Sequence, residues 1–123
     1  MIDGGRFSIS GRTKAFGYAI AGLAYVFKTA HAIWIQSAIA ACAIAVGFYL
    51  HISASDWRWV ALAIALVWTT EIMNTAVESV CDALHPEHHP LIGKAKDAAA
   101  GAVLMAGIGA VIIGIFTFWP YLF

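Results

Sequence analysis

The sequence predicts an all-α membrane protein in which three transmembrane helices follow an amphipathic surface helix. Of the 123 residues, 62% are hydrophobic and only 11% are charged, and the mean hydropathy is +0.82. Long uncharged stretches are separated by short polar segments, a pattern typical of helices that cross a bilayer. We therefore expect residues 1–123 to form one integral-membrane domain.

The charged residues and the cysteines argue against two kinds of site. The formal net charge is zero and the Lys and Arg residues form no long run, so a nucleic acid would meet no basic surface. Cys42 and Cys81 lie on different predicted spans without CxxC spacing, which favours buried, inert thiols over a metal centre.

The first predicted helix covers about residues 8–28. Between Lys14 and Phe27 polar and apolar side chains alternate imperfectly, as expected for a helix that lies on the membrane with its apolar side in the headgroup boundary. Ala21 and Gly22 leave room for direct packing against another helix. We favour a surface helix over a fourth transmembrane span.

The first predicted span covers residues 31–50. No Asp, Glu, Lys or Arg occurs from Thr29 to Ser55, and roughly 18 apolar residues are enough to mark a spanning helix. A short polar turn follows, in which Ser55 or Asp56 is expected to cap the next helix. Because this turn is short, we expect the first two spans to be antiparallel neighbours.

The second predicted span covers residues 57–84. At ~1.5 Å per residue it is ~42 Å long, which exceeds a hydrocarbon core of ~30 Å, so one end must protrude. Its apolar half comes first, which puts Glu71 ~21 Å along the helix and still within the membrane. We expect Glu78 and Asp82 to lie at the water interface.

The third predicted span covers residues 96–119, after a polar connection. Pro86, Pro90, Gly93 and the neighbouring charges predict a loop up to Lys96, and Pro120 is expected to end the span. One face carries a small residue at every fourth position, which lets helix backbones approach closely in lipid. These residues are Ala98, Ala102, Ala106, Ala110 and Gly114.

Basic residues predict the orientation. Six of the seven fall on one side of the predicted membrane, namely Arg6, Arg12, Lys14, Lys28, Lys94 and Lys96. Only Arg58 falls on the other side. Because basic residues concentrate on the cytoplasmic side, we expect a cytoplasmic N-terminus and a cytoplasmic loop between the second and third spans.

Four polar residues lie on one face of the second span. Glu71, Asn74, Glu78 and Asp82 fall within a stripe about 80° wide at ~100° per residue. A charge near the bilayer centre costs roughly 2.5 to 3.5 kcal/mol on insertion scales. Such a stripe therefore indicates a functional site that faces protein or water.

The residue types in this stripe and at the start of the third predicted span suit phosphoryl transfer. Glu71 is the best placed general base for a lipid hydroxyl, and Glu78 is the candidate ligand for Mg²⁺, which prefers carboxylates together with substrate phosphates. Lys96 is expected to neutralise phosphate charge, and Asp97 to orient Lys96 or contact a nucleotide.

These residues alone leave several functions open. No GxxxxGK[ST] or GxGxxG segment occurs, so neither common phosphate-binding loop is present. A polar stripe of this kind is about equally compatible with a lipid-modifying enzyme, an ion or proton path and a structural membrane subunit. The three loop histidines fit a solvated loop better than a metal site; they are His85, His88 and His89.

Two segments carry a family resemblance. EIMNTAVESVCD and HHPLIGKAKDAAAGAV closely resemble the signature of the prokaryotic diacylglycerol kinase and undecaprenol kinase family, E-x-x-N-[ST]-x-x-E-x-x-x-D followed by a His-containing loop and A-K-D-x-x-[AS]-[AG]-A-V. The motif runs from Glu71 to Val103, and the surface helix with three spans agrees with the family over nearly the whole chain.

The resemblance implies a homotrimer in a bacterial cytoplasmic membrane, with sites between subunits where Mg²⁺ and ATP serve phosphorylation of a lipid alcohol. It implies that Glu71 is the general base, Asn74 a supporting hydrogen-bonding residue and Glu78 the Mg²⁺ ligand. The implied nucleotide side consists of Lys14, Tyr18, Asp82, Lys96 and Asp97. The HHPL wording favours undecaprenol over diacylglycerol as the substrate.

One position departs from the family pattern. Where the family commonly has an acidic Mg²⁺ ligand at the entry to the first span, this chain has Ala30, and His31 is a poor Mg²⁺ ligand. This departure leaves an alternative open, a catalytically impaired family member that acts as a membrane assembly subunit.

Overall fold

The computed structural model describes residues 8–85 and 87–123, and within them the fold is entirely helical. Helix α1 spans Ile9–Thr29, α2 spans His31–Leu50, α3 spans Ala54–Leu84 and α4 spans Pro90–Leu122. By length and composition, α2, α3 and α4 qualify as membrane-spanning helices among the described residues. The expected all-helical fold with three long apolar helices is therefore confirmed.

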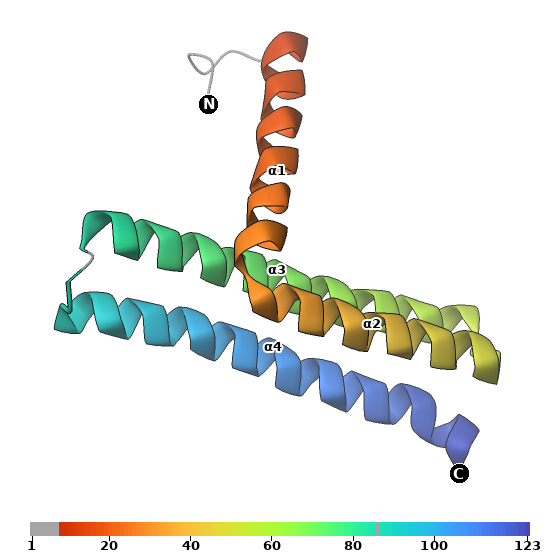
Figure 1. The fold of residues 1–123 in the computed structure, drawn as a ribbon. Coiled ribbons are helices and arrows are strands. Elements are labelled where there is room, and N and C mark those ends of the chain that lie inside the picture. Colours follow the sequence, from red (N-terminus) through yellow and green to blue (C-terminus); the bar gives the residue numbers. More distant parts are fainter. Residues whose placement is uncertain (1–7, 86) are drawn as a thin grey trace.

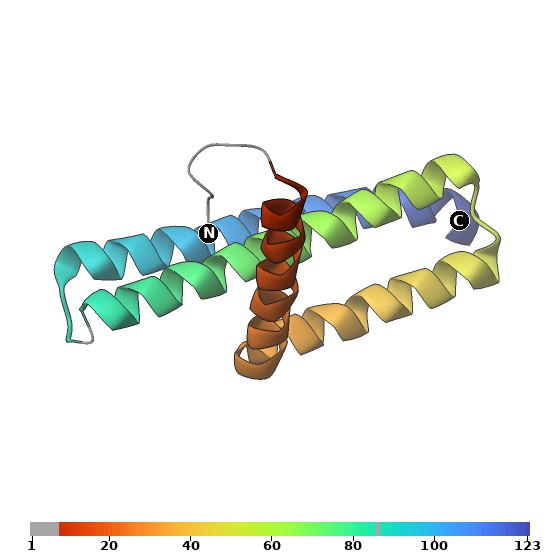
Figure 2. The same ribbon diagram turned by 90° about the horizontal axis from the view of Figure 1, so that it is seen from above.

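Helices α3 and α4 form the most extensive helix pair, lying antiparallel and joined by the short connection that follows Leu84 (Figure 1). Helix α2 packs on α3 and is shorter. The turn between α2 and α3 lies at the same end as the C-terminus (Figure 1). The elbow between α1 and α2 therefore meets α3 partway along its length, and the rest of α3 continues past it with α4 (Figure 2).

Helix α1 stands across the other three helices (Figures 1 and 2). The change of direction occurs at Ala30, whose extended backbone (φ −97°, ψ 104°) separates two helical segments. Aromatic side chains hold the elbow, because the Phe27 ring packs edge-to-face on Trp34 and Trp68, and Trp34 Nε1 donates to the Phe27 carbonyl at 2.7 Å. The amphipathic surface role of α1 stays a prediction.

The start of α3 corrects one expectation. Neither Ser55 nor Asp56 is the N-cap; Ser53 is, and its Oγ accepts from the Asp56 N–H at 3.1 Å. The Asp56 carboxylate in turn accepts from the Ser53 hydroxyl at 2.9 Å. The cap satisfies the Asp56 N–H, a backbone donor that an uncapped helix leaves free. Before it, His51 closes α2 in the left-handed region (φ 53°).

Helix α4 is longer than the predicted span at both ends. The expected loop up to Lys96 is wrong beyond His89, because the helix begins at Pro90, where a missing N–H costs nothing in the first turn. The His89 ring caps it by accepting from the Leu91 N–H at 3.1 Å. Pro120 does not end the helix, which continues to Leu122. Proline so near the C-terminus disrupts only the last turn.

Candidate active site

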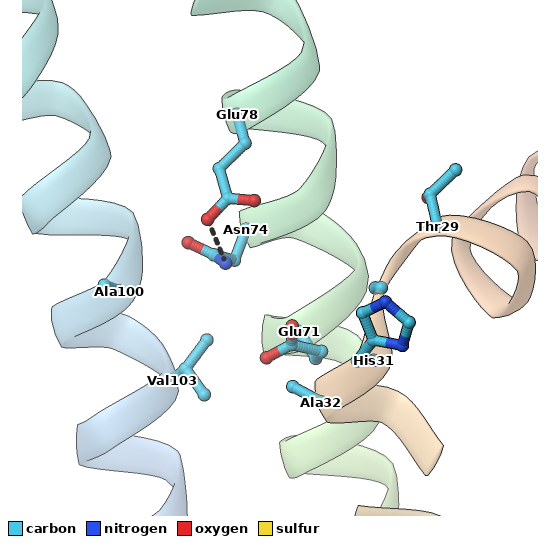
Figure 3. Close-up of a pocket in the computed structure, with 9 residues that line it drawn as sticks. Thr29, His31, Ala32, Glu71, Asn74, Glu78, Ala100 and Val103 are labelled. Atoms are coloured by element: carbon cyan, nitrogen blue, oxygen red, sulfur yellow. Dashed lines mark hydrogen bonds between the residues drawn. The ribbon is translucent and has the colours of Figure 1, made fainter. Parts of the chain in front are cut away.

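A pocket of about 370 Å³ opens where the α1–α2 elbow faces α3 and α4 (Figure 3). Helix α3 contributes its polar stripe, the elbow contributes small residues and one imidazole, and α4 contributes two apolar side chains. The lining residues are Thr29, Ala30, His31, Ala32, Glu71, Asn74, Glu78, Ala100 and Val103.

Glu71 lies at the inner end of the polar stripe. Its side chain is only 5% exposed, although it is a carboxylate on an apolar helix. The Gln36 Nε2 atom of α2 donates to Glu71 Oε2 over 3.4 Å, and Thr75 Oγ1 donates to the Glu71 backbone carbonyl at 3.0 Å. A buried charge normally requires hydrogen-bonding partners, and within the described residues the single side-chain partner of the Glu71 carboxylate is the long contact with Gln36.

Asn74 and Glu78 form the outer part of the pocket. Asn74 Nδ2 donates to Glu78 Oε1 at 3.1 Å (Figure 3). Asn74 is 8% exposed and its Oδ1 is buried without a hydrogen-bond partner among the described residues, whereas Glu78 is exposed. The pocket therefore grades from a buried carboxylate at Glu71 to a solvated one at Glu78, with an unpaired carbonyl oxygen between them.

The nucleotide-side residues predicted from the sequence do not line this pocket. Lys96 instead pairs with Asp82 across α3 and α4, with 2.6 Å between Lys96 Nζ and Asp82 Oδ1. Asp97 is exposed and is not the partner of Lys96. Lys14 and Tyr18 are exposed on α1, away from the pocket lining.

The oxygen atoms in the pocket fit a hard divalent cation better than a transition metal. Glu71, Asn74 and Glu78 offer carboxylate and amide oxygens, the donors that Mg²⁺ takes together with substrate phosphates. Within residues 8–85 and 87–123, no group of three His, Cys, Asp or Glu side chains is placed to hold a metal by itself. Any Mg²⁺ would thus need ligands beyond this chain's described acids. Ala30 lines the pocket without a donor.

Gln36 is the polar residue that the sequence reading missed. It is the only amide in α2, and it also lines an apolar groove of about 750 Å³ between α2, α3 and α4. A buried polar side chain in a membrane helix is itself a signal of function. Its contact with Glu71 depends on how α2 packs on α3, which periodicity does not reveal.

The fold and the pocket define a small helical membrane protein with a carboxylate-lined site beside the point where its chain bends. A family model described as prokaryotic diacylglycerol kinase matches residues 17–118. This chain belongs to that family and is a lipid kinase, a membrane-associated transferase of lipid metabolism.

Curated relatives agree with this assignment. The chain is 35% identical over 109 residues to the undecaprenol kinase of Bacillus subtilis, covering 89% of each chain. It is 42% identical over 101 residues to the diacylglycerol kinase of Synechocystis, covering 81% of this chain and 58% of the relative. It is 31% identical over 120 residues to the diacylglycerol kinase of Escherichia coli, covering 92% of this chain and 98% of the relative.

Proposed function

We propose that this kinase transfers the γ-phosphoryl group of Mg²⁺·ATP to the hydroxyl of a membrane lipid alcohol at the cytoplasmic face of a bacterial membrane. The observation that carries the proposal is the burial of Glu71, which is 5% exposed beside an open pocket. A carboxylate held at the edge of the apolar region can take a proton from a hydroxyl that water does not reach.

Glu71 is the proposed general base. As the lipid oxygen attacks the γ-phosphorus, its proton passes to the Glu71 carboxylate and ADP leaves. The buried amide of Asn74 supports this step, because its Oδ1 has no partner among the described residues and is free to accept a hydrogen bond from a ligand, while its Nδ2 donates to Glu78. Buried polar atoms without partners are costly, so Asn74 Oδ1 is suited to a bound ligand.

Glu78 is the proposed protein ligand for Mg²⁺, because it is exposed and fixed by Asn74 at 3.1 Å. When bound there, the cation would neutralise negative charge on the phosphates. Lys96 adds a fixed positive charge for the same purpose, held by Asp82 at 2.6 Å, and Asp97 contacts the nucleotide.

We further propose a homotrimer with sites shared between subunits. Lys14 and Tyr18 on α1 lie outside the pocket of their own chain, so a neighbouring subunit is the source of these nucleotide contacts. Extensive apolar exposure on α4, as at Leu104 and Met105, leaves surface for helix packing. The basic residues that precede α2 support a cytoplasmic N-terminus.

Undecaprenol is the proposed substrate in preference to diacylglycerol. Support comes from the segment HHPLIGKAKDAAAGAV and from the 35% identity to a relative named undecaprenol kinase. Both alcohols present a primary hydroxyl at the membrane interface, so the same base serves either.

Purified protein in mixed micelles tests the proposal. The assay measures phosphate transfer from ATP to undecaprenol and to diacylglycerol, with and without Mg²⁺. We expect Mg²⁺-dependent turnover that is faster with undecaprenol. Faster turnover with diacylglycerol would reverse the substrate assignment, and no turnover with either lipid would overturn the proposed function.

A further inference from the structure

Gln36 lies between the polar pocket and the apolar groove. It lines the groove between α2, α3 and α4, where the other side chains are apolar apart from the indole N–H of Trp68. Its Nε2 atom reaches out of this groove to Glu71 Oε2, and Glu71 lines the polar pocket. One hydrogen bond of 3.4 Å thus joins the apolar groove to the proposed catalytic carboxylate.

The second polar atom of the same amide is unused. Gln36 Oε1 is buried and has no hydrogen-bond partner among the described residues. Leaving a buried acceptor unpaired destabilises a fold. An apolar residue would fill the groove without this penalty, so the amide at this position needs a reason that packing does not supply.

We infer that Gln36 is a positioning residue for Glu71 in both of its protonation states, an inference that rests on the proposed function. While Glu71 is ionised, the amide N–H donates to the carboxylate and fixes its direction toward the pocket. After Glu71 takes the hydroxyl proton, its carboxyl group is itself a donor. Rotation of the amide by half a turn then brings Oε1 to the neutral acid, because an amide carries a donor and an acceptor in one plane.

The proton balance of this cycle is complete. The lipid O–H bond breaks, the lipid oxygen gains the phosphoryl group, and the proton resides on Glu71 until water removes it. Gln36 gains and loses no proton, and it acts through its hydrogen bond to Glu71. Gln36 keeps the Glu71 carboxylate directed at the lipid hydroxyl. Its loss should therefore lower the rate of the chemical step and leave nucleotide binding unchanged.

The test replaces Gln36 with Met, which has similar length and fits an apolar groove. We expect kcat to fall about tenfold, the worth of one hydrogen bond to a charged group, while KM for ATP stays unchanged. Ser37→Ala is the matched control, because the Ser37 hydroxyl donates to the Ile33 carbonyl of its own helix at 2.7 Å. That variant should retain wild-type kcat.

A double-mutant cycle separates positioning from a structural effect. In Glu71→Asp the carboxylate is withdrawn by one methylene and no longer reaches Gln36, so adding Gln36→Met should cost much less than it does in the wild type. An equal loss in both backgrounds, or no loss in either, would overturn the inference. The same assay also compares the wild type with Glu71→Asp. If the wild type turns over and the Glu71 variant is slower, the proposed function stands even when the inference about Gln36 fails.

Discussion

The Tyr25 hydroxyl lies 2.7 Å from the Ser79 hydroxyl, and this hydrogen bond ties α1 to α3 one residue beyond Glu78. Together with the Phe27, Trp34 and Trp68 rings, it sets the direction in which α1 leaves the other helices. Helix α1 carries two of the proposed nucleotide-contacting residues, Lys14 and Tyr18, so this bond links their position to the pocket.

Removing the Tyr25–Ser79 bond is predicted to weaken nucleotide binding and leave the chemical step intact. One hydrogen bond of this kind is worth about 1 kcal/mol, so Tyr25→Phe should raise KM for ATP about fivefold with little change in kcat. Ser79→Ala should give the same result. The control is Tyr49→Phe, a tyrosine that is 83% exposed on α2. A lower kcat at unchanged KM would contradict this account of α1.

Replacing the proposed base is predicted to remove activity and preserve the assembly. Glu71→Gln keeps the size of a side chain that is 5% exposed but takes away the proton acceptor, and positioned general bases contribute about 10² to 10⁴ in rate. The measurement is kcat with each lipid, alongside size-exclusion chromatography in detergent. Retention of most of the wild-type kcat would show that another group accepts the proton.

How well the sequence predicts the end of each helix depends on what determines that end. The limits of α2 agree with the predicted span of 31–50 because polar residues flank an uncharged stretch. Helix α4 begins before the predicted start, because Pro90 and the charges that follow it favour a loop when residue type alone is considered. Proline is favourable at the first helical position, and a helix that extends beyond the bilayer tolerates charge.

In the site, too, features set within one helix were predictable from the sequence, whereas contacts between helices were not. Helical periodicity predicted that Glu71, Asn74 and Glu78 share a face, and all three line one pocket. Their catalytic roles stay predictions. Gln36 escaped notice because its meaning comes from a contact between α2 and α3, and the pairing of Lys96 with Asp82 likewise joins two helices. Such contacts depend on packing angles and rotamers, which residue spacing does not encode.

A carboxylate introduced at position 30, in the elbow, is predicted to strengthen Mg²⁺ binding at this site. Ala30 lines the pocket with Glu78 and offers no ligand atom, so Ala30→Glu should lower the Mg²⁺ concentration needed for half-maximal rate. The matched control is Ala30→Gln, which has the same length without the charge. An unchanged Mg²⁺ titration and rate in Ala30→Glu would remove this position from the metal site.

The Lys96–Asp82 pair is predicted to matter through Lys96. Both side chains are partly exposed, at 39% and 65%, and exposed ion pairs contribute little to stability. Lys96→Met should therefore leave the fold stable. It should lower kcat by about 10² or more, because a charge that stabilises a phosphoryl group is lost. Asp82→Asn should have a smaller effect, because Lys96 keeps its charge and loses only its orientation. Equal small effects would assign the pair a purely structural role.

At the opposite end of the molecule, Tyr121 is predicted to stabilise the fold without affecting activity. Its hydroxyl donates to Asp56 Oδ2 at 2.5 Å and accepts from the Ser53 N–H at 3.2 Å, so it fastens the end of α4 to the turn before α3. Tyr121→Phe keeps the ring and removes both bonds, which should lower the unfolding temperature in detergent by a few degrees. Because the α3 residues that line the pocket lie in the half of the helix remote from Asp56, kcat and KM should remain at wild-type values. Loss of activity in a variant that is still folded would show that this end of the bundle is coupled to the site.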